Sequence, residues 1–187
     1  MTSILKVSEI QDPTNSNTAI SIDANGVVTK GTGGQLPAFL AYPSTNFNAS
    51  LGQYNVTNES NLIYASVHYN YGSHYNTSTG RFVAPVTGLY HFWANMAMNS
   101  NANTYVYMSA EIHYWSANGN TLNTRWIGGW GNKQTSNNVY DRHYYSIAIP
   151  LTAGDGVSAG YEMATASVPV IGGGSGNYSS FGGYLIG

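Results

Sequence analysis

The chain has 187 residues, a formal net charge of −2, and only 7% charged residues, whereas an ordinary soluble protein carries about 25%. Its surface must therefore be covered mainly by neutral polar groups. Without clustered Lys and Arg there is no electrostatic reason to attract nucleic acid or anionic membrane surfaces, and neither is expected as a partner.

The first 34 residues differ in kind from the rest. Short alternating runs at residues 4–10 and 19–23 predict strands, Asn25-Gly26 predicts a tight hairpin turn, and the glycines of residues 31–34 predict a linker. So few apolar side chains cannot close a core alone. We expect residues 1–34 to be a β-hairpin anchoring or trimerisation segment that needs a partner, with an ordinary capping hairpin of the domain as the alternative.

Residues 35–187 predict a single all-β domain. Strand-like runs recur about every eight to twelve residues with turn clusters between them, which is typical of a sandwich. No window sustains an apolar helical period. A loop is expected at residues 96–104 and a second hairpin turn at Asn118-Gly119. The expected strands cover residues 36–42, 62–68, 81–86, 89–93, 105–115, 124–127, 140–149, 157–166 and 178–186.

Three ordered motifs carry a family resemblance. The first is Gly72-x-x-Tyr75-Asn76-x-x-x-Gly80-x-Phe82-x-Ala84-Pro85-x-x-Gly88-x-Tyr90-x-Phe92. The others are Leu151-x-x-Gly154-Asp155-x-Val157 and Ser180-Phe181-x-Gly183-x-Leu185. Together they resemble the complement C1q globular head, one of the tumour-necrosis-factor-like jelly rolls. That resemblance implies a ten-strand jelly-roll sandwich that assembles as a homotrimer and binds rather than catalyses. The residues expected in its core or trimer interface are Phe82, Tyr90, Phe92, Phe181, Tyr184 and Leu185.

The N-terminal segment carries a second resemblance. The segment resembles the leader of structural proteins of tailed bacteriophages, especially those of cyanobacterial hosts. The resemblance lies in two runs, Ser-Ile-Leu-Lys-Val-x-Glu-Ile-Gln-Asp and, after it, Ala-Ile-x-Ile-Asp-x-x-Gly-x-Val-Thr. This implies a virion protein made in the host cytoplasm, exposed on the particle surface and joined to other virion proteins through residues 1–34. No signal-peptide h-region or membrane-length apolar run is visible, so membrane insertion is not expected.

Candidate catalytic and metal groups are dispersed. Five carboxylates fall in the domain, at Glu59, Glu111, Asp141, Asp155 and Glu162, and none has a recognisable catalytic context. Asp155 lies in Gly-Asp-Gly and is expected to satisfy its own turn. Asp141 and His143 alone are too few ligands for a stable metal site, and cysteine is absent. We expect no catalytic residues, no metal and no cofactor.

The candidate binding residues are aromatic. Trp115, Trp126 and Trp130 lie close in sequence to Asn132 and Tyr140. Aromatic rings beside amides and hydroxyls suit neutral polysaccharide, because the ring covers the C–H face while the polar groups bond hydroxyls. Large aromatics in a jelly roll also serve as core or trimer interface, and both readings stay open here.

The sequence-based hypothesis is a non-enzymatic structural virion protein of a tailed bacteriophage, as a tail fibre, spike or appendage component that contacts the host surface. One alternative is a capsid decoration or cement protein, and another is a bacterial carbohydrate-binding lectin. An enzyme acting on surface glycans is disfavoured by the lack of positioned carboxylates.

Overall fold

The computed structural model describes residues 9–11, 18–22, 28–30, 36–45, 47–48, 62–99, 105–117, 122–127, 140–165, 170–171 and 178–187. Every regular element in these ranges is a strand. In this part of the chain, no helix has the length and apolar character that crossing a membrane requires. The chain divides into two compact units, Met1–Leu36 and Pro37–Gly187.

The first unit contains a three-stranded antiparallel sheet in the order β1-β2-β3. Ile22 pairs with Val28 at the point where β2 and β3 meet the predicted Asn25-Gly26 turn, and the turn itself lies outside the described residues. The strand predicted at residues 4–10 is described only from Glu9 onward. The three strands are β1 (Glu9–Gln11), β2 (Thr18–Ile22) and β3 (Val28–Lys30).

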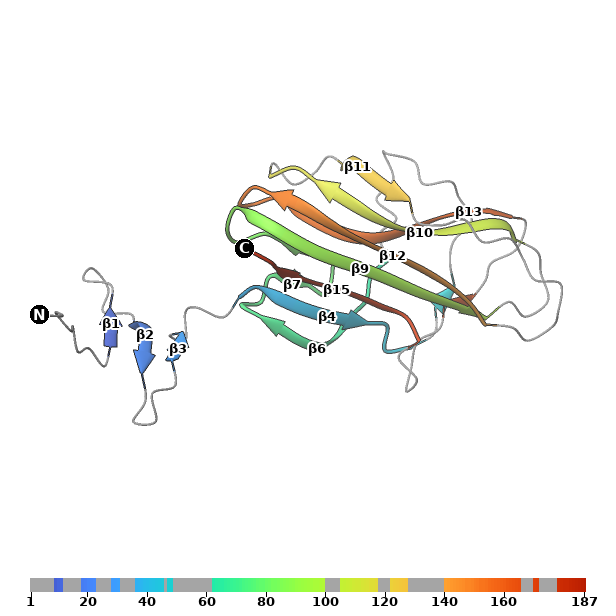
Figure 1. Ribbon diagram of the computed structural model, residues 1–187. Helices are drawn as coiled ribbons and strands as arrows, with labels where there is room; N and C mark the ends of the chain where they lie inside the picture. Colours follow the sequence, from blue (N-terminus) through green and yellow to red (C-terminus); the bar gives the residue numbers. More distant parts are fainter. Residues whose placement is uncertain are drawn as a thin grey trace, which may run out of the picture. The chain divides into compact units, whose positions relative to one another are not determined.

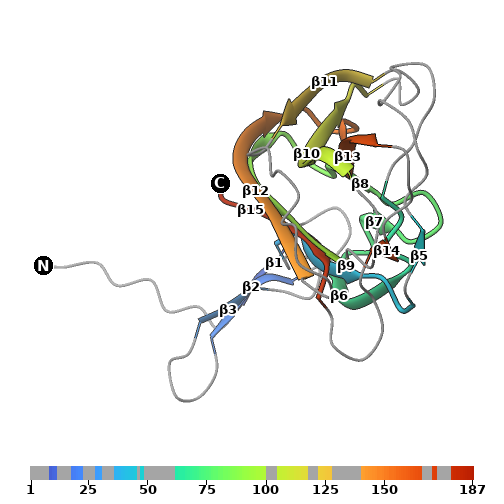
Figure 2. The same cartoon turned by 90° about the vertical axis from the view of Figure 1, so that its right-hand side faces the viewer.

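The second unit is a sandwich of two antiparallel sheets (Figures 1 and 2). The five-stranded sheet has the order β11 (Leu122–Ile127), β10 (Tyr105–Trp115), β13 (Gly156–Thr165), β8 (Arg81–Val83) and β7 (Tyr75–Asn76). The seven-stranded sheet has the order β5 (Phe47–Asn48), β14 (Val170–Ile171), β9 (Gly88–Asn99), β15 (Ser180–Leu185), β4 (Ala38–Tyr42) and β6 (Ser66–Tyr71), with β12 (Tyr140–Leu151) also paired to β9. The all-β jelly-roll prediction is confirmed.

Aromatic rings fill the space between the two sheets. The ring of Phe39 on β4 stacks on Tyr75 at 4.7 Å and on Phe82 at 5.2 Å between centroids, and it meets Phe181 edge-on at 5.0 Å. Each of these side chains is 3% exposed or less. An aromatic side chain buries about 150–250 Å², so this cluster supplies much of the apolar burial that holds the sheets together.

Two adjacent glycines let β15 lie close to the large side chains of β9. Gly183 pairs with Phe92 on the core side, and Gly182 pairs with Trp93 on the opposite side of the sheet. A Cβ added at Gly183 would overlap the Phe92 ring, and one added at Gly182 would overlap the Trp93 indole. Strand β15 therefore accommodates one aromatic ring on each face because neither position carries a side chain.

The structure corrects two local predictions. The loop expected at residues 96–104 is wrong for residues 96–99, because β9 continues to Asn99 and pairs there with β12 from Tyr140 onward. That partner strand supplies hydrogen bonds which the local sequence of small and polar residues does not reveal. The strand expected at residues 81–86 ends at Val83, and the backbone N–H of Ala84 donates instead to the carbonyl of Asp155 at 2.8 Å.

Candidate functional site

The register of β10 and β11 separates two tryptophans that are close in sequence. Ile112 pairs with Trp126 and Tyr114 pairs with Thr124, so these four side chains share the face that looks toward the core. Trp115 follows Tyr114 directly and therefore points to the opposite face, because strand side chains alternate. The sequence-based grouping of Trp115 with Trp126 in one patch is corrected by this alternation.

Trp115 is enclosed rather than available to a ligand. Its side chain is 1% exposed, and its indole N–H donates to the hydroxyl of Ser158 at 2.9 Å. The guanidinium carbon of Arg81 lies 3.9 Å from the ring centroid, which is a cation–π arrangement. Trp115 and Leu122 form a small hydrophobic cluster separate from the main core. Trp115 therefore stabilises the β10-β13-β8 part of the sheet.

The same face of β10 holds a buried polar pair. The imidazole Nε2 of His113 lies 2.8 Å from Glu111 Oε2, and both side chains are fully buried. Gly160 on β13 lies against the His113 ring, and a Cβ there would overlap the ring. The pair is fully buried and packs against β13, so it has the character of a structural contact.

The Asp155 side chain is occupied by hydrogen bonds to Thr152 and Tyr114. Its Oδ2 accepts from the backbone N–H of Thr152 at 2.8 Å and from the hydroxyl of Tyr114 at 3.1 Å. The predicted role as a turn residue therefore agrees with its contacts. The described part of the chain contains no cluster of three or more His, Cys, Asp or Glu that could hold a metal ion.

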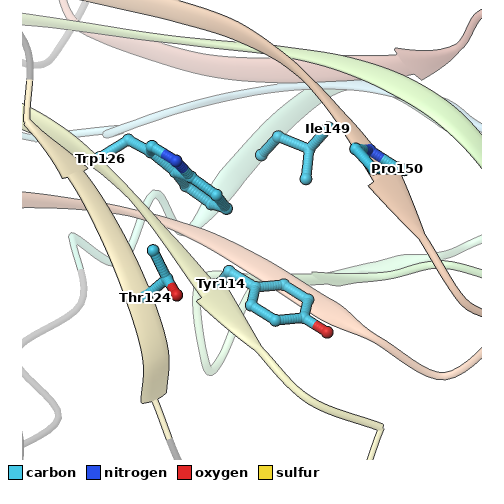
Figure 3. Close-up of a pocket in the computed structure, with 5 residues that line it drawn as sticks. All are labelled: Tyr114, Thr124, Trp126, Ile149 and Pro150. Carbon is cyan, nitrogen blue, oxygen red and sulfur yellow. The ribbon is translucent and has the colours of Figure 1, made fainter.

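A cavity of about 260 Å³ lies between β10 and β11 on one side and β12 on the other (Figure 3). The residues of this inter-sheet cavity are Tyr114, Thr124, Trp126, Ile149 and Pro150. The Trp126 and Tyr114 rings lie 6.2 Å apart at an angle of 52°, and together they form an aromatic corner. Figure 3 shows both rings directed toward the strand that carries Ile149 and Pro150.

The Tyr114 hydroxyl is oriented by Asp155. The pKa of this hydroxyl is raised above its ordinary value, first by burial and then by the hydrogen bond to, and the negative charge of, the Asp155 carboxylate. The phenol stays protonated at neutral pH, and its O–H donates a hydrogen bond to the Asp155 carboxylate. The lone pairs of its oxygen remain able to accept a hydrogen bond from another group.

The seven-stranded sheet presents a second aromatic surface on the side away from the core. Tyr184 pairs with His91 and Ala38, and Ala38 pairs with Tyr71, so these side chains share that outer side. The rings of Trp93 and Tyr184 are 6.3 Å apart. We call this surface the aromatic face and define it by Tyr42, Tyr71, Trp93, Tyr144 and Tyr184.

The aromatic face is exposed and almost uncharged. Tyr144, Tyr71 and Tyr184 are 59%, 45% and 43% exposed, which is high for aromatic side chains of a regular sheet. By strand alternation, Arg142 on β12 is the one formally charged side chain on this face among the described residues. Apolar rings gathered on one exposed face are a feature of protein–protein contacts.

The residues predicted for the trimer core or interface divide between the inter-sheet core and the outer surface. Phe82, Tyr90, Phe92 and Phe181 are fully buried between the two sheets of a single copy. They therefore belong to the core and offer no surface to a second copy. Leu185 is half-buried and packs against the same core, so Tyr184 is the member of the set with a large exposed area.

The predicted ligand-binding set is described only in part. Trp126 is half-buried and lines the inter-sheet cavity, whereas Trp115 does not. Trp130 and Asn132 lie outside the described residues, and Tyr140 is described only as the first residue of β12. Sequence reasoning missed Tyr114 and Ile149, which reach the cavity from separate sheets. The alternation of apolar and polar side chains along residues 105–115 could have placed Tyr114 on the core side.

The two-sheet topology and the inter-sheet aromatic core define a jelly-roll protein of the tumour-necrosis-factor-like kind. The sequence profile of the C1q domain matches residues 46–186, which is more than half of the chain. The chain belongs to the C1q domain family. Nothing in this family assignment indicates catalysis, and the domain is of a binding or structural type.

Relatives by sequence are similar over a limited stretch. The chain is 38% identical over 77 residues to "Complement C1q tumor necrosis factor-related protein 3" of Homo sapiens and of Mus musculus. That stretch is 41% of this chain and 28% of each relative's length. The similarity therefore concerns part of those proteins, and both relatives come from animals.

Solved structures show the same fold over most of the chain. The globular domain of the zebrafish complement 1qA protein superposes with a TM-score of 0.55 at 16% identity, covering 81% of this chain and 98% of that chain. The Eiger TNF of S. frugiperda gives a TM-score of 0.54 at 13% identity, covering 81% and 93%. At such identities the likeness concerns the fold alone.

Proposed function

We propose that the chain is a non-enzymatic, homotrimeric attachment protein, and that it serves on a tailed bacteriophage particle as part of a tail fibre, spike or similar appendage. The observation that carries the proposal is the exposed aromatic face of the seven-stranded sheet, which has Arg142 as its one described charged side chain and Tyr144 59% exposed. Such a surface favours burial against further copies, because its apolar rings gain by leaving water.

Closed cyclic symmetry is the simplest way to bury this face. Each copy presents the same sheet, and a threefold arrangement covers all copies without leaving an open edge for further growth. The trimer implied by the C1q resemblance agrees with this reasoning. The role on a phage particle is supported by the leader text within residues 1–34, which resembles the leaders of phage structural proteins and contains the sheet β1-β2-β3.

The trimer is tested by charge insertion. Tyr184→Arg places a cation on the aromatic face, where burying an unpaired charge is costly. The matched control is Val83→Arg, which adds the same charge at a residue that is 42% exposed on β8 of the other sheet. Light scattering should give three times the chain mass for the wild type and the control, and a lower mass for Tyr184→Arg. A monomeric wild type at micromolar concentration would refute the trimer.

The location on the particle needs a separate experiment. A gold or fluorescent-protein label on the chain, imaged on phage particles by electron microscopy, should appear on the tail appendages. A label distributed over the head would instead identify a capsid decoration protein. A chain that never enters particles would exclude both virion roles and leave the lectin alternative, which the aromatic corner of Tyr114 and Trp126 favours.

A further inference from the structure

We propose that the inter-sheet cavity binds one neutral sugar ring. Sugar binding by the cavity does not depend on the attachment role proposed above. Only its biological purpose, recognition of the host surface, rests on that role. The cavity is formed from three strands of two sheets, β10, β11 and β12, which places its walls on rigid elements rather than on loops.

The volume of the cavity limits the size of its ligand. About 260 Å³ corresponds to roughly eight or nine water molecules at about 30 Å³ each. It falls just below the range of about 300–1,000 Å³ that holds drug-sized ligands. A single ring with its substituents fits this space, whereas a longer oligosaccharide would have to extend beyond it.

The lining matches the two kinds of surface that a pyranose ring presents. Trp126 and Tyr114 form the aromatic corner, and aromatic planes pack well against the C–H face of a sugar. Ile149 and Pro150 supply an aliphatic wall on the β12 side. The polar groups are the Thr124 hydroxyl and the Tyr114 oxygen, and the latter is held by Asp155 with its lone pairs left to accept from a ligand hydroxyl.

The charge of the site selects against ionic ligands. None of the described residues that line the cavity carries a formal charge. The Asp155 carboxylate is hydrogen-bonded to Tyr114, and its negative charge repels anions. Phosphate, sulfated sugars and uronic acids are therefore poor ligands, and a neutral sugar with several hydroxyl donors is the class that the lining favours.

The cavity is distinct from the aromatic face. Tyr114, Thr124 and Trp126 belong to the five-stranded sheet and look toward the inter-sheet space, while the aromatic face lies on the far side of the seven-stranded sheet. Ile149 is 4% exposed and packs in the core. Assembly through the aromatic face and binding in the cavity are consequently separable by mutation.

The test uses the full chain labelled with 5-fluorotryptophan, whose four fluorine signals are assigned by single Trp→Phe variants. The probes are methyl α-D-glucopyranoside, methyl β-D-galactopyranoside and N-acetylglucosamine, each added alone, with glucuronic acid as the anionic comparison. At least one neutral sugar should shift the Trp126 signal in a saturable way, and glucuronic acid should not. The signals of Trp93 and Trp115 should stay in place.

Variants then separate the sugar site from a general effect on folding. Tyr114→Phe keeps the ring and removes the hydroxyl acceptor. Trp126→Ala removes half of the aromatic corner. Because that variant lacks the Trp126 fluorine signal, its sugar binding is measured by saturation-transfer NMR of the sugar. Each substitution should weaken binding by about tenfold or more. Ile63→Thr, at a residue that is 46% exposed and outside the cavity, is the control and should bind as the wild type does.

Several outcomes would overturn the inference. One is that no neutral sugar shifts Trp126 at saturating millimolar concentration. Another is that sugar binding appears only in the Tyr184→Arg variant, which would show that a neighbouring copy fills the cavity in the assembled protein. A third is equal binding by Tyr114→Phe and the wild type. None of these results changes the oligomer mass or the particle location, so the proposed function would stand or fall separately.

Discussion

Two buried tyrosine hydroxyls are expected to make the domain less stable at alkaline pH. Tyr64 and Tyr75 are 0% and 3% exposed, and the Tyr75 hydroxyl donates to the Tyr64 carbonyl at 3.0 Å. Burial raises the pKa of both phenols above the ordinary value of about 10, and for Tyr64 the neighbouring Tyr75 adds to the rise. In the folded state both side chains are thus held in the neutral form.

The sign of the pH dependence follows from these raised pKa values. The unfolded chain ionises near its ordinary pKa while the folded chain does not, so the contribution is complete below about pH 10 and is lost above it. We expect the free energy of unfolding to fall by up to about 1.4 kcal/mol per pH unit for each of the two groups. Denaturant titrations between about pH 9 and pH 12 measure this slope.

Substitution assigns the slope to the two residues. The double variant Tyr64→Phe/Tyr75→Phe starts less stable, because it lacks the hydroxyl contacts, but its free energy of unfolding should fall less steeply above pH 10. Tyr144→Phe, at an exposed position, should keep the wild-type slope. Equal slopes for the double variant and the wild type would contradict the assignment.

Gly160 illustrates how one missing side chain admits a buried polar pair. The His113 ring occupies the space where a Cβ would stand, and it is held there by Glu111 at 2.8 Å. Gly160→Ala should lower the free energy of unfolding by about 1–3 kcal/mol, because the enclosed ring cannot move aside without breaking that contact. Gly187→Ala, where nothing lies within 4 Å of the added Cβ, should be neutral in the same denaturation assay.

At the scale of the strand, β15 separates folding from assembly. Gly183→Ala acts on the core, because the new methyl group meets the Phe92 ring, and it should lower the stability of each copy by about 1–3 kcal/mol. Gly182→Ala acts on the outer side, where the Trp93 ring must shift. It should weaken the oligomer more than it weakens the fold.

This pair of neighbouring substitutions serves as its own control. Thermal denaturation reports on the fold, and sedimentation velocity at decreasing concentration reports on the assembly. If Gly182→Ala left the association constant at the wild-type value, the aromatic face would not be the contact between copies. If Gly183→Ala were neutral for thermal stability, the packing of Phe92 against β15 would be looser than its contacts indicate.

At the scale of the whole molecule, the two compact units predict a clean truncation. All three C1q motifs and the aromatic core lie in Pro37–Gly187. Deleting residues 1–36 should leave a folded domain with a melting temperature within about 4 °C of the full chain. The truncated protein should no longer enter phage particles, since the proposed anchor is missing. Incorporation of the truncated form at the normal level would place the attachment elsewhere.

Much of the fold could be predicted because its signals are local. Alternation of apolar and polar residues, turn clusters such as Asn76 to Gly80, and the spacing of the C1q motifs each act within a few residues of the chain. The Asn76 side chain indeed accepts from the backbone N–H groups of Ser78 and Thr79, as a turn residue should. These local preferences settled the all-β class and the expected place of most strands.

The tertiary structure decided which side of each strand is used and what covers it. Alternation along β10 puts Trp115 on one face and Tyr114 with Trp126 on the other, but which strand of the second sheet lies over the core face is set by long-range packing. Likewise, Tyr90 and Phe92 are core residues while Tyr184 is exposed. One face of the β9-β15 pair packs against the five-stranded sheet, and the other face does not. The inter-sheet cavity arises only where Ile149 and Pro150 of β12 lie opposite β10 and β11, so its chemistry depends on packing between the two sheets rather than on sequence spacing alone.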